Sequence, residues 1–255
     1  MRLYGILLAA VVTVPTPAEA GPSAKEVIHH TLESNHWGFS AAKVQARAVL
    51  VDRRGRKSTL VFKGISRKWK GYLTKGLVRF SSPPNLAGAG FLQIEQDSRD
   101  DDRFIYLPAL KRSRRVAGSQ RSNAFMGTDF NYADLDRRDW RTGKAVLRGD
   151  TKIGKFPCYH ITITPTRRDS PYSRIEIDVR KDNWVPLKIQ LYDKAKVLYK
   201  VLEVFQLRRI KGQWFISKSR MKNLRETHTT TLFLTKIEPT DKIPDSEFTV
   251  QRLER

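Results

Sequence analysis

Cysteine is nearly absent from this chain of 255 residues, because Cys158 is the single one. One thiol excludes an intrachain disulfide framework and a zinc site built from several cysteines. Acidic residues are also scarce: 26 Asp and Glu stand against 48 Lys and Arg, which gives a formal net charge of +22. We therefore expect an anionic partner, such as a phosphate, an acidic lipid surface or an acidic protein.

The common signatures of catalysis and nucleotide binding are missing as well. The chain holds no G-x-S-x-G, no H-E-x-x-H, no phosphate-binding P-loop and no G-x-G-x-x-G motif. A hydrolase is disfavoured because no nucleophile is paired with a base in a recognisable pattern. We predict no catalytic residue and no cofactor, and we expect a binding protein rather than an enzyme.

Long apolar runs are absent beyond the N-terminus. Residues 3–14 are apolar, and Ala18 and Ala20 supply an A-x-A cleavage pattern. The apolar run is shorter than the roughly 20 residues that span a bilayer. It predicts a signal peptide over residues 1–20 that is cleaved after Ala20, and a single exported domain over residues 21–255.

The remaining sequence predicts one helix followed mostly by antiparallel strands. Ser23 with Glu26 three residues later is typical of a capping box, which would begin a helix over residues 23–37. Short alternating segments with turn signals then recur, as in residues 44–50 and 174–180. Several exceed the usual strand length, which predicts a large, curved sheet with one buried face.

Residues 111–139 follow neither the strand nor the helix period, and long excursions of this kind are usually functional. We interpret them as a lid with short helical turns at most. Their basic cluster is a candidate contact for an anionic head group or membrane surface, and it consists of Lys111, Arg112, Arg114 and Arg115. Their apolar residues include Phe125, Met126 and Phe130.

An apolar face is predicted on one later strand. Its alternating apolar residues are Val185, Leu187, Ile189 and Leu191. Such a face must be covered by a helix, by a lid or by a ligand. These four residues and the three apolar residues of the lid are therefore our candidate binding residues for an apolar cargo.

Two groups of residues raise the possibility of a metal site, and both are incomplete. The acidic group lacks the central Gly and terminal Glu of an EF-hand loop, and it consists of Asp97, Asp100, Asp101 and Asp102. The pairs His29 with His36 and Cys158 with His160 lack a third ligand at a recognisable spacing. We predict no metal site, a solvated acidic loop and a buried Cys158.

Several stretches carry a resemblance to a known family. Residues 104–115 read FIYLPALKRSRR and residues 122–135 read SNAFMGTDFNYADL. Residues 184–189 (WVPLKI), 211–215 (KGQWF) and 243–250 (IPDSEFTV) fit the same pattern. Over nearly the whole exported chain, the sequence resembles the outer-membrane lipoprotein-sorting family, which has a LolA-like fold.

The resemblance implies an α+β protein, mostly antiparallel β, in which a large curved sheet forms a half-open LolA/LolB-like barrel. An N-terminal helix and a lid would cover its concave mouth. The implied function is a periplasmic carrier or chaperone that shelters acyl chains of a lipid or lipoprotein for transport to the outer membrane. The alternative is an accessory subunit of an envelope transport or assembly machine that binds a partner segment in the same cavity.

The expected partners follow from this interpretation. They are acyl chains, an anionic membrane surface and an inner-membrane transporter. Nucleic acid is the usual partner of such a charge in the cytosol, but we do not expect it for an exported protein.

Overall fold

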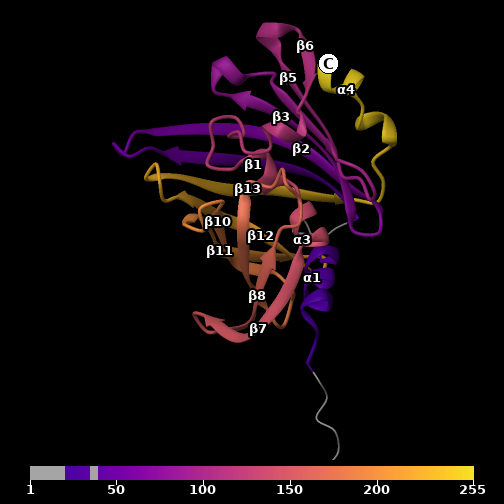
Figure 1. Cartoon of the computed structure of the whole chain (residues 1–255). Coiled ribbons are helices and arrows are strands. Elements are labelled where there is room, and N and C mark those ends of the chain that lie inside the picture. Colours follow the sequence, from indigo (N-terminus) through magenta and orange to yellow (C-terminus); the bar gives the residue numbers. More distant parts are fainter. Residues whose placement is uncertain (1–20, 35–39) are drawn as a thin grey trace, which may run out of the picture.

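The computed structural model describes residues 21–34 and 40–255 (Figure 1). The predicted signal peptide, its cleavage site after Ala20 and the end of the predicted helix, including His36, lie outside the described residues. Within the two described ranges, no helix has both the length and the apolar character needed to cross a membrane.

The first element is the helix α1 (Ala24–Glu33), and the predicted capping box at its start is confirmed. The Glu26 backbone N–H donates to Ser23 Oγ at 3.3 Å, and the Ser23 backbone N–H donates to Glu26 Oε2 at 2.7 Å. A helix of ten residues is marginal in water, so α1 depends on packing for its stability.

Thirteen antiparallel strands form one open, curved sheet, which confirms the predicted fold class. Their spatial order is β6-β5-β4-β3-β2-β1-β13-β12-β11-β10-β9-β8-β7, so the pairing of β1 with β13 joins the two halves of the chain. The strands are β1 (Ala41–Val51), β2 (Lys57–Lys70), β3 (Leu73–Ser82), β4 (Gly90–Ile94), β5 (Asp102–Leu107), β6 (Arg112–Arg115), β7 (Lys144–Ile153), β8 (Phe156–Thr164), β9 (Tyr172–Arg180), β10 (Pro186–Asp193), β11 (Leu198–Ile210), β12 (Gln213–Asn223) and β13 (His228–Thr240).

The predicted excursion is largely confirmed, with one correction at its start. Its basic beginning is the edge strand β6, which pairs with β5. The rest contains only short helical elements, which are η3 (Gly118–Gln120), α2 (Tyr132–Leu135) and α3 (Arg138–Thr142). We call residues 116–142 the lid, because they lie across one face of the sheet (Figure 1).

The opposite face of the sheet is partly covered by the C-terminal segment. We call residues 243–254 the strap, and they contain η4 (Asp245–Glu247) and α4 (Val250–Glu254). Its side chains Ile243, Phe248 and Leu253 form a buried cluster with residues of β3 and β4. The short turns η1 (Pro84–Leu86) and η2 (Pro108–Leu110) connect the strands beneath it.

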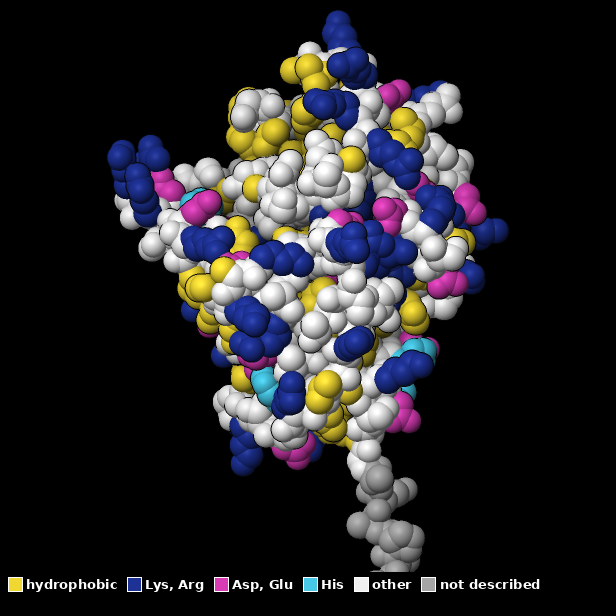
Figure 2. Space-filling model, in the orientation of Figure 1, with side chains coloured by type: hydrophobic (Ala, Val, Ile, Leu, Met, Phe, Trp, Pro, Cys, Tyr) yellow, Lys and Arg dark blue, Asp and Glu magenta, His cyan; other side chains and the backbone are white. Residues whose placement is uncertain are grey.

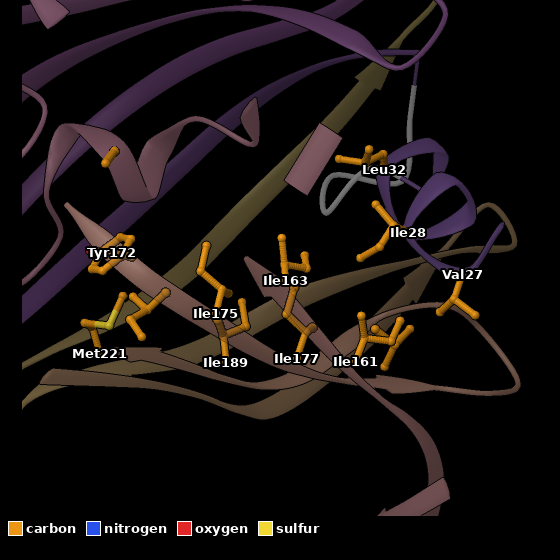
Figure 3. Close-up of a cluster of buried hydrophobic side chains, with 13 residues drawn as sticks. Val27, Ile28, Leu32, Ile161, Ile163, Tyr172, Ile175, Ile177, Ile189 and Met221 are labelled. Atoms are coloured by element: carbon orange, nitrogen blue, oxygen red, sulfur yellow. The ribbon is translucent and has the colours of Figure 1, made fainter. Parts of the chain in front are cut away.

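The largest buried cluster lies where α1 packs on the end of the sheet (Figure 3). Val27, Ile28 and Leu32 of α1 point toward isoleucines of β8 and β9, including Ile161 and Ile177. Each fully buried aliphatic side chain contributes about 1.5–3 kcal/mol. This packing fixes α1 at one end of the concave face.

Candidate functional site

A cavity of about 380 Å³ lies between the concave face of the sheet and the lid. Its walls come from β1–β4, from β9–β13 and from the lid. The sheet residues that line it are mainly apolar and include Val44, Phe62, Val78, Phe91, Ile175, Ile189, Leu191, Leu202, Ile216, Met221, Leu232 and Leu234.

The strand register explains why this lining is continuous. Ile189 of β10 lies opposite Leu202 of β11, and Leu202 lies opposite Met221 of β12. On the other side of β10, Leu191 lies opposite Ile175 of β9. Directly opposed residues of neighbouring strands share one face, so apolar residues at alternate positions build one apolar floor.

Several of the predicted binding residues meet in this cavity. Phe125 and Phe130 line it from the lid, and Ile189 and Leu191 line it from the floor. Phe125 also packs edge-on against Phe91, with the ring centroids 5.0 Å apart. The aromatic part of the lid therefore rests on the apolar part of the sheet.

The predicted alternation from Val185 to Leu191 is wrong at its beginning. Pro186 pairs with Val179 and Lys188 pairs with Asp178, so Leu187 is an extra residue in an irregularity of the ladder. Pro186 consequently takes the position that lines the cavity. Val185 and Leu187 are buried, with 3% and 6% of their surface exposed, but they do not line it.

Met126 is placed beside the cavity lining rather than within it. Its backbone is left-handed, with φ of 49°, and Gly127 follows with φ of 74°. This turn lies between Ala124 and Asn131, which form an isolated bridge. Met126 packs there against the buried cluster that contains Phe80.

Polar contacts hold the lid to the sheet on the side of β13. Asp129 of the lid accepts a hydrogen bond from Thr230 Oγ1 at 2.6 Å, and its backbone N–H donates to the same oxygen at 2.9 Å. His228 Nδ1 lies 2.8 Å from Asp129 Oδ2. Asp129 and Thr230 are both buried, which makes these bonds costly to break.

A second contact crosses the cavity from the lid to its floor. Lys200 Nζ of β11 lies 3.1 Å from Asp134 Oδ2 of α2, and Lys200 is fully buried. The Tyr172 hydroxyl of β9 donates to the same carboxylate. Burial, and after it the Asp134 carboxylate, raises the pKa of Tyr172 well above its usual value, so the phenol stays a donor.

A third contact fastens the lid to the end of β4. Arg137 Nη2 lies 2.8 Å from Glu95 Oε2, and Arg137 also donates to the backbone carbonyls of Leu32 and Tyr72. Burial is the largest single effect and favours the neutral form of Glu95. The charge and hydrogen bonds of Arg137, with the Arg141 charge and a hydrogen bond from Thr74, together outweigh burial and lower the pKa of that carboxyl. Glu95 is therefore charged when the lid is in place.

A buried ion-pair network supports the base of the lid. The Asp136 carboxylate accepts hydrogen bonds from Arg103 of β5 and from Arg121, the latter at 3.1 Å. Burial raises the pKa of Asp136 to about 6 despite the two guanidinium groups. The predicted solvated acidic loop is wrong at Asp101, which is 3% exposed and pairs with Arg103 at 3.0 Å.

We did not predict these contacts between the lid and the sheet from the sequence. One signal was available: Lys200 occupies an inward position of β11, two residues before Leu202, where the alternation calls for an apolar residue. The arginines of the lid gave no such signal. Nothing in their spacing indicates that they pair with Glu95 and Asp101, the acids in the connection between β4 and β5.

The predicted basic cluster lies at the sheet edge. Lys111 follows η2 with a left-handed backbone, and Arg112 and Arg114 are exposed on β6. Arg115 differs from them because it forms an ion pair with Asp102 at 2.8 Å. The cluster therefore adjoins the start of the lid without lining the cavity.

The other candidate ligands have structural partners. Cys158 is fully buried, as predicted, and burial raises the pKa of its thiol. His160 Nδ1 lies 2.7 Å from Asp178 Oδ1. Among the described residues, no group of three or more His, Cys, Asp or Glu side chains is arranged to hold a metal ion.

Comparisons with known proteins agree with this architecture. A family model described as "-like: Uncharacterized protein" matches residues 73–255. No curated protein matches the chain.

Solved structures share the fold over most of the chain. A domain from Vibrio parahaemolyticus, whose name refers to outer-membrane lipoprotein sorting, is 24% identical with a TM-score of 0.85, covering 91% of this chain and 98% of that one. A DUF1329 family protein from Desulfovibrio piger is 24% identical with a TM-score of 0.83, covering 91% and 100%. A LolA superfamily protein from Nitrosomonas europaea is 17% identical with a TM-score of 0.71, covering 90% and 98%. The fold is therefore LolA-like, as the resemblance implied.

Proposed function

The chain belongs to the protein family whose model matches residues 73–255, and we propose that it is a periplasmic carrier or chaperone for acyl chains of a lipid or lipoprotein bound for the outer membrane. The observation that carries the proposal is the apolar cavity beneath the lid. Its volume of about 380 Å³ falls within the roughly 300–1,000 Å³ of small-molecule sites. Burial there is worth about 0.8 kcal/mol per CH₂ group.

The lining supports an acyl chain rather than a polar ligand. Side chains such as Ile189, Leu202 and Leu232 offer no hydrogen bonds to a ligand. Met221 also adapts its shape readily, which suits chains of different length. The names of two structures that share the fold, which refer to lipoprotein sorting and to the LolA superfamily, support the same class of cargo.

The lid supplies the means of loading and release. Its contacts with the sheet are made by side chains rather than by strand pairing: polar ones such as Asp134 with Lys200, and apolar ones such as Phe125 with Phe91. The lid can therefore lift without breaking any strand pairing of the thirteen-stranded sheet. Lifting exposes the floor of the cavity to a membrane or to a partner protein.

The sheet edge beside the lid is the proposed place of contact with an anionic membrane. Leu110 is 45% exposed next to Lys111, Arg112 and Arg114. Figure 2 shows dark-blue Lys and Arg side chains beside yellow hydrophobic ones at the top of the molecule, where Figure 1 places β5 and β6. Basic residues beside an exposed apolar residue fit an acidic lipid surface.

Titration with a fluorescent fatty acid tests the proposal. The purified protein is expected to bind the probe saturably, and unlabelled fatty acid is expected to displace it. Leu202→Trp fills the cavity from the floor and is expected to lower the affinity. Phe205→Trp is the matched control, because Phe205 lies on the same strand and is 50% exposed outside the cavity.

Two results would overturn the proposal. One is the absence of saturable binding by the folded protein. The other is equal loss of binding in Leu202→Trp and Phe205→Trp. Binding of an apolar peptide but not of fatty acid would support the accessory subunit that holds a partner segment in this cavity.

A further inference from the structure

The face of the sheet opposite the cavity carries a groove of about 420 Å³ beside the strap. Its floor comes from β1, β2, β3 and β13, and Glu247 and Arg252 of the strap form one side. Lys43 and Lys63 are exposed in it. Nothing in the cavity or the lid explains this cluster of positive charge.

The groove contains two cations that face each other across a pair of strands. Lys63 of β2 lies directly opposite Arg79 of β3. Like charges in directly opposed positions destabilise a sheet. Burial lowers the pKa of Arg79, and the nearby Arg252 charge lowers it further. Among the described residues, Lys63 forms no ion pair. The two acids of the groove, Glu238 and Glu247, pair with Lys236 and Arg252 instead.

The same two strands contain a second such pair, and there the chain supplies the counter-charge itself. Arg67 lies opposite Lys75, four residues from Lys63 and Arg79 on the same face. Asp245 of the strap bridges them, with Oδ1 2.5 Å from Arg67 Nη2 and 2.6 Å from Lys75 Nζ. An acid therefore bridges one opposed pair. Among the described residues no carboxylate bridges the other pair, in which Arg79 donates only to the backbone carbonyls of Gly88 and Arg252.

Apolar contacts accompany the acid in the strap. Ile243 and Phe248 flank Asp245 and pack on the sheet over Leu77. Ile65, opposite Leu77, lies between the two opposed pairs and is partly exposed in the groove. The groove thus repeats the chemistry that the strap already satisfies: two opposed cations beside an apolar residue.

We propose that this groove binds an acidic segment of a partner protein, whose carboxylate bridges Lys63 and Arg79 as Asp245 bridges Arg67 and Lys75. An apolar side chain next to that carboxylate would pack on Ile65. A protein segment is favoured over a bilayer because the strap walls one side of the groove, and an extended chain reaches its floor more readily than a flat surface does. On this face, Arg67 and Lys75 already bind a carboxylate of a protein segment, namely Asp245 of the strap.

The probe is a fluorescent peptide with the sequence of the strap, Ile-Pro-Asp-Ser-Glu-Phe. The control peptide has Asn in place of Asp and Gln in place of Glu. We expect the protein to bind the acidic peptide saturably and the amide peptide about tenfold more weakly. The double variant Lys43→Glu with Lys63→Glu is expected to bind the acidic peptide about tenfold or more weakly than the wild type does. Lys144→Glu with Lys152→Glu, an equal charge change on the exposed edge strand β7, is the matched control.

The outcomes separate this proposal from the carrier function. Equal binding of the two peptides, or equal loss in the two variants, would overturn it as non-specific attraction. A third outcome is that the peptide does not bind the protein, while Lys43→Glu with Lys63→Glu weakens binding of the protein to phosphatidylglycerol vesicles. That outcome would make this face a membrane contact instead. Fatty-acid binding is expected to stay unchanged in both variants, because none of the four lysines lines the cavity.

Discussion

Lys200 Nζ lies 3.1 Å from Asp134 Oδ2, and this contact joins the floor of the cavity to the lid. Both side chains are buried, with 1% and 4% of their surface exposed. A charge in such a place is stable only with its partner, because desolvation of a lone ion is expensive. The contact therefore stabilises the closed lid, because opening the lid would separate the two buried charges.

Removal of Lys200 is expected to be more harmful than removal of the whole pair. Lys200→Met leaves Asp134 buried without its cation and should lower the free energy of unfolding by about 3–5 kcal/mol. Lys200→Met with Asp134→Leu should recover much of that loss, since no charge stays unpaired. Urea unfolding measures the free energy of unfolding of both variants. A double variant no more stable than Lys200→Met would contradict the pairing argument.

The raised pKa of Asp136 predicts a dependence of stability on pH. The folded protein holds this proton with a pKa of about 6, against the ordinary value of 3.8. Because the native state binds the proton more tightly, the contribution of Asp136 to stability is greatest below pH 4 and declines as the pH rises to 6. The full difference is about 3 kcal/mol.

Asp136→Asn removes this titration and provides the comparison. The stability of the wild type relative to the variant should fall as the pH rises from 4 to 6. Glu95, whose pKa is lowered, contributes the opposite slope to both proteins and therefore cancels in the difference. A difference that is constant over this range would show that Asp136 titrates normally.

Gly143, which connects α3 to β7, is expected to tolerate no side chain. A Cβ at this position would lie 2.5 Å from the Asp139 carbonyl oxygen and 2.5 Å from Ile163 Cγ2. Gly143→Ala should therefore cost about 1–3 kcal/mol of unfolding free energy. Gly76→Ala is the control, because the nearest atom to a Cβ there is 3.8 Å away. Equal stability of the two variants in thermal or urea unfolding would refute the steric argument.

The basic sheet edge predicts binding to anionic vesicles. Arg112→Gln with Arg114→Gln should weaken vesicle binding, since each basic residue near an acidic surface contributes about 1 kcal/mol. The salt dependence should become shallower as well. Lys144→Gln with Lys152→Gln removes the same charge elsewhere and should have a smaller effect. Arg115 is left intact because it pairs with Asp102.

The sequence by itself determined the local elements and the class of fold. Ser23 and Glu26 set the start of α1, because a capping box depends only on residues three apart. Alternating apolar and polar residues set strands such as β9, because successive side chains point to opposite faces. The motifs of residues 104–115 and 122–135 indicated the LolA-like fold that the structure has.

The cavity and its closure were decided only by the tertiary structure. The irregularity at Leu187 depends on how β10 pairs with β9, so Pro186 rather than Leu187 came to line the cavity. Asp134 meets Lys200 across 66 positions of the chain, and no local pattern reports such a distance. Local periodicity specifies the face of the sheet on which a residue lies. The residue that it contacts across the cavity depends on the curvature of the sheet and on the position of the lid.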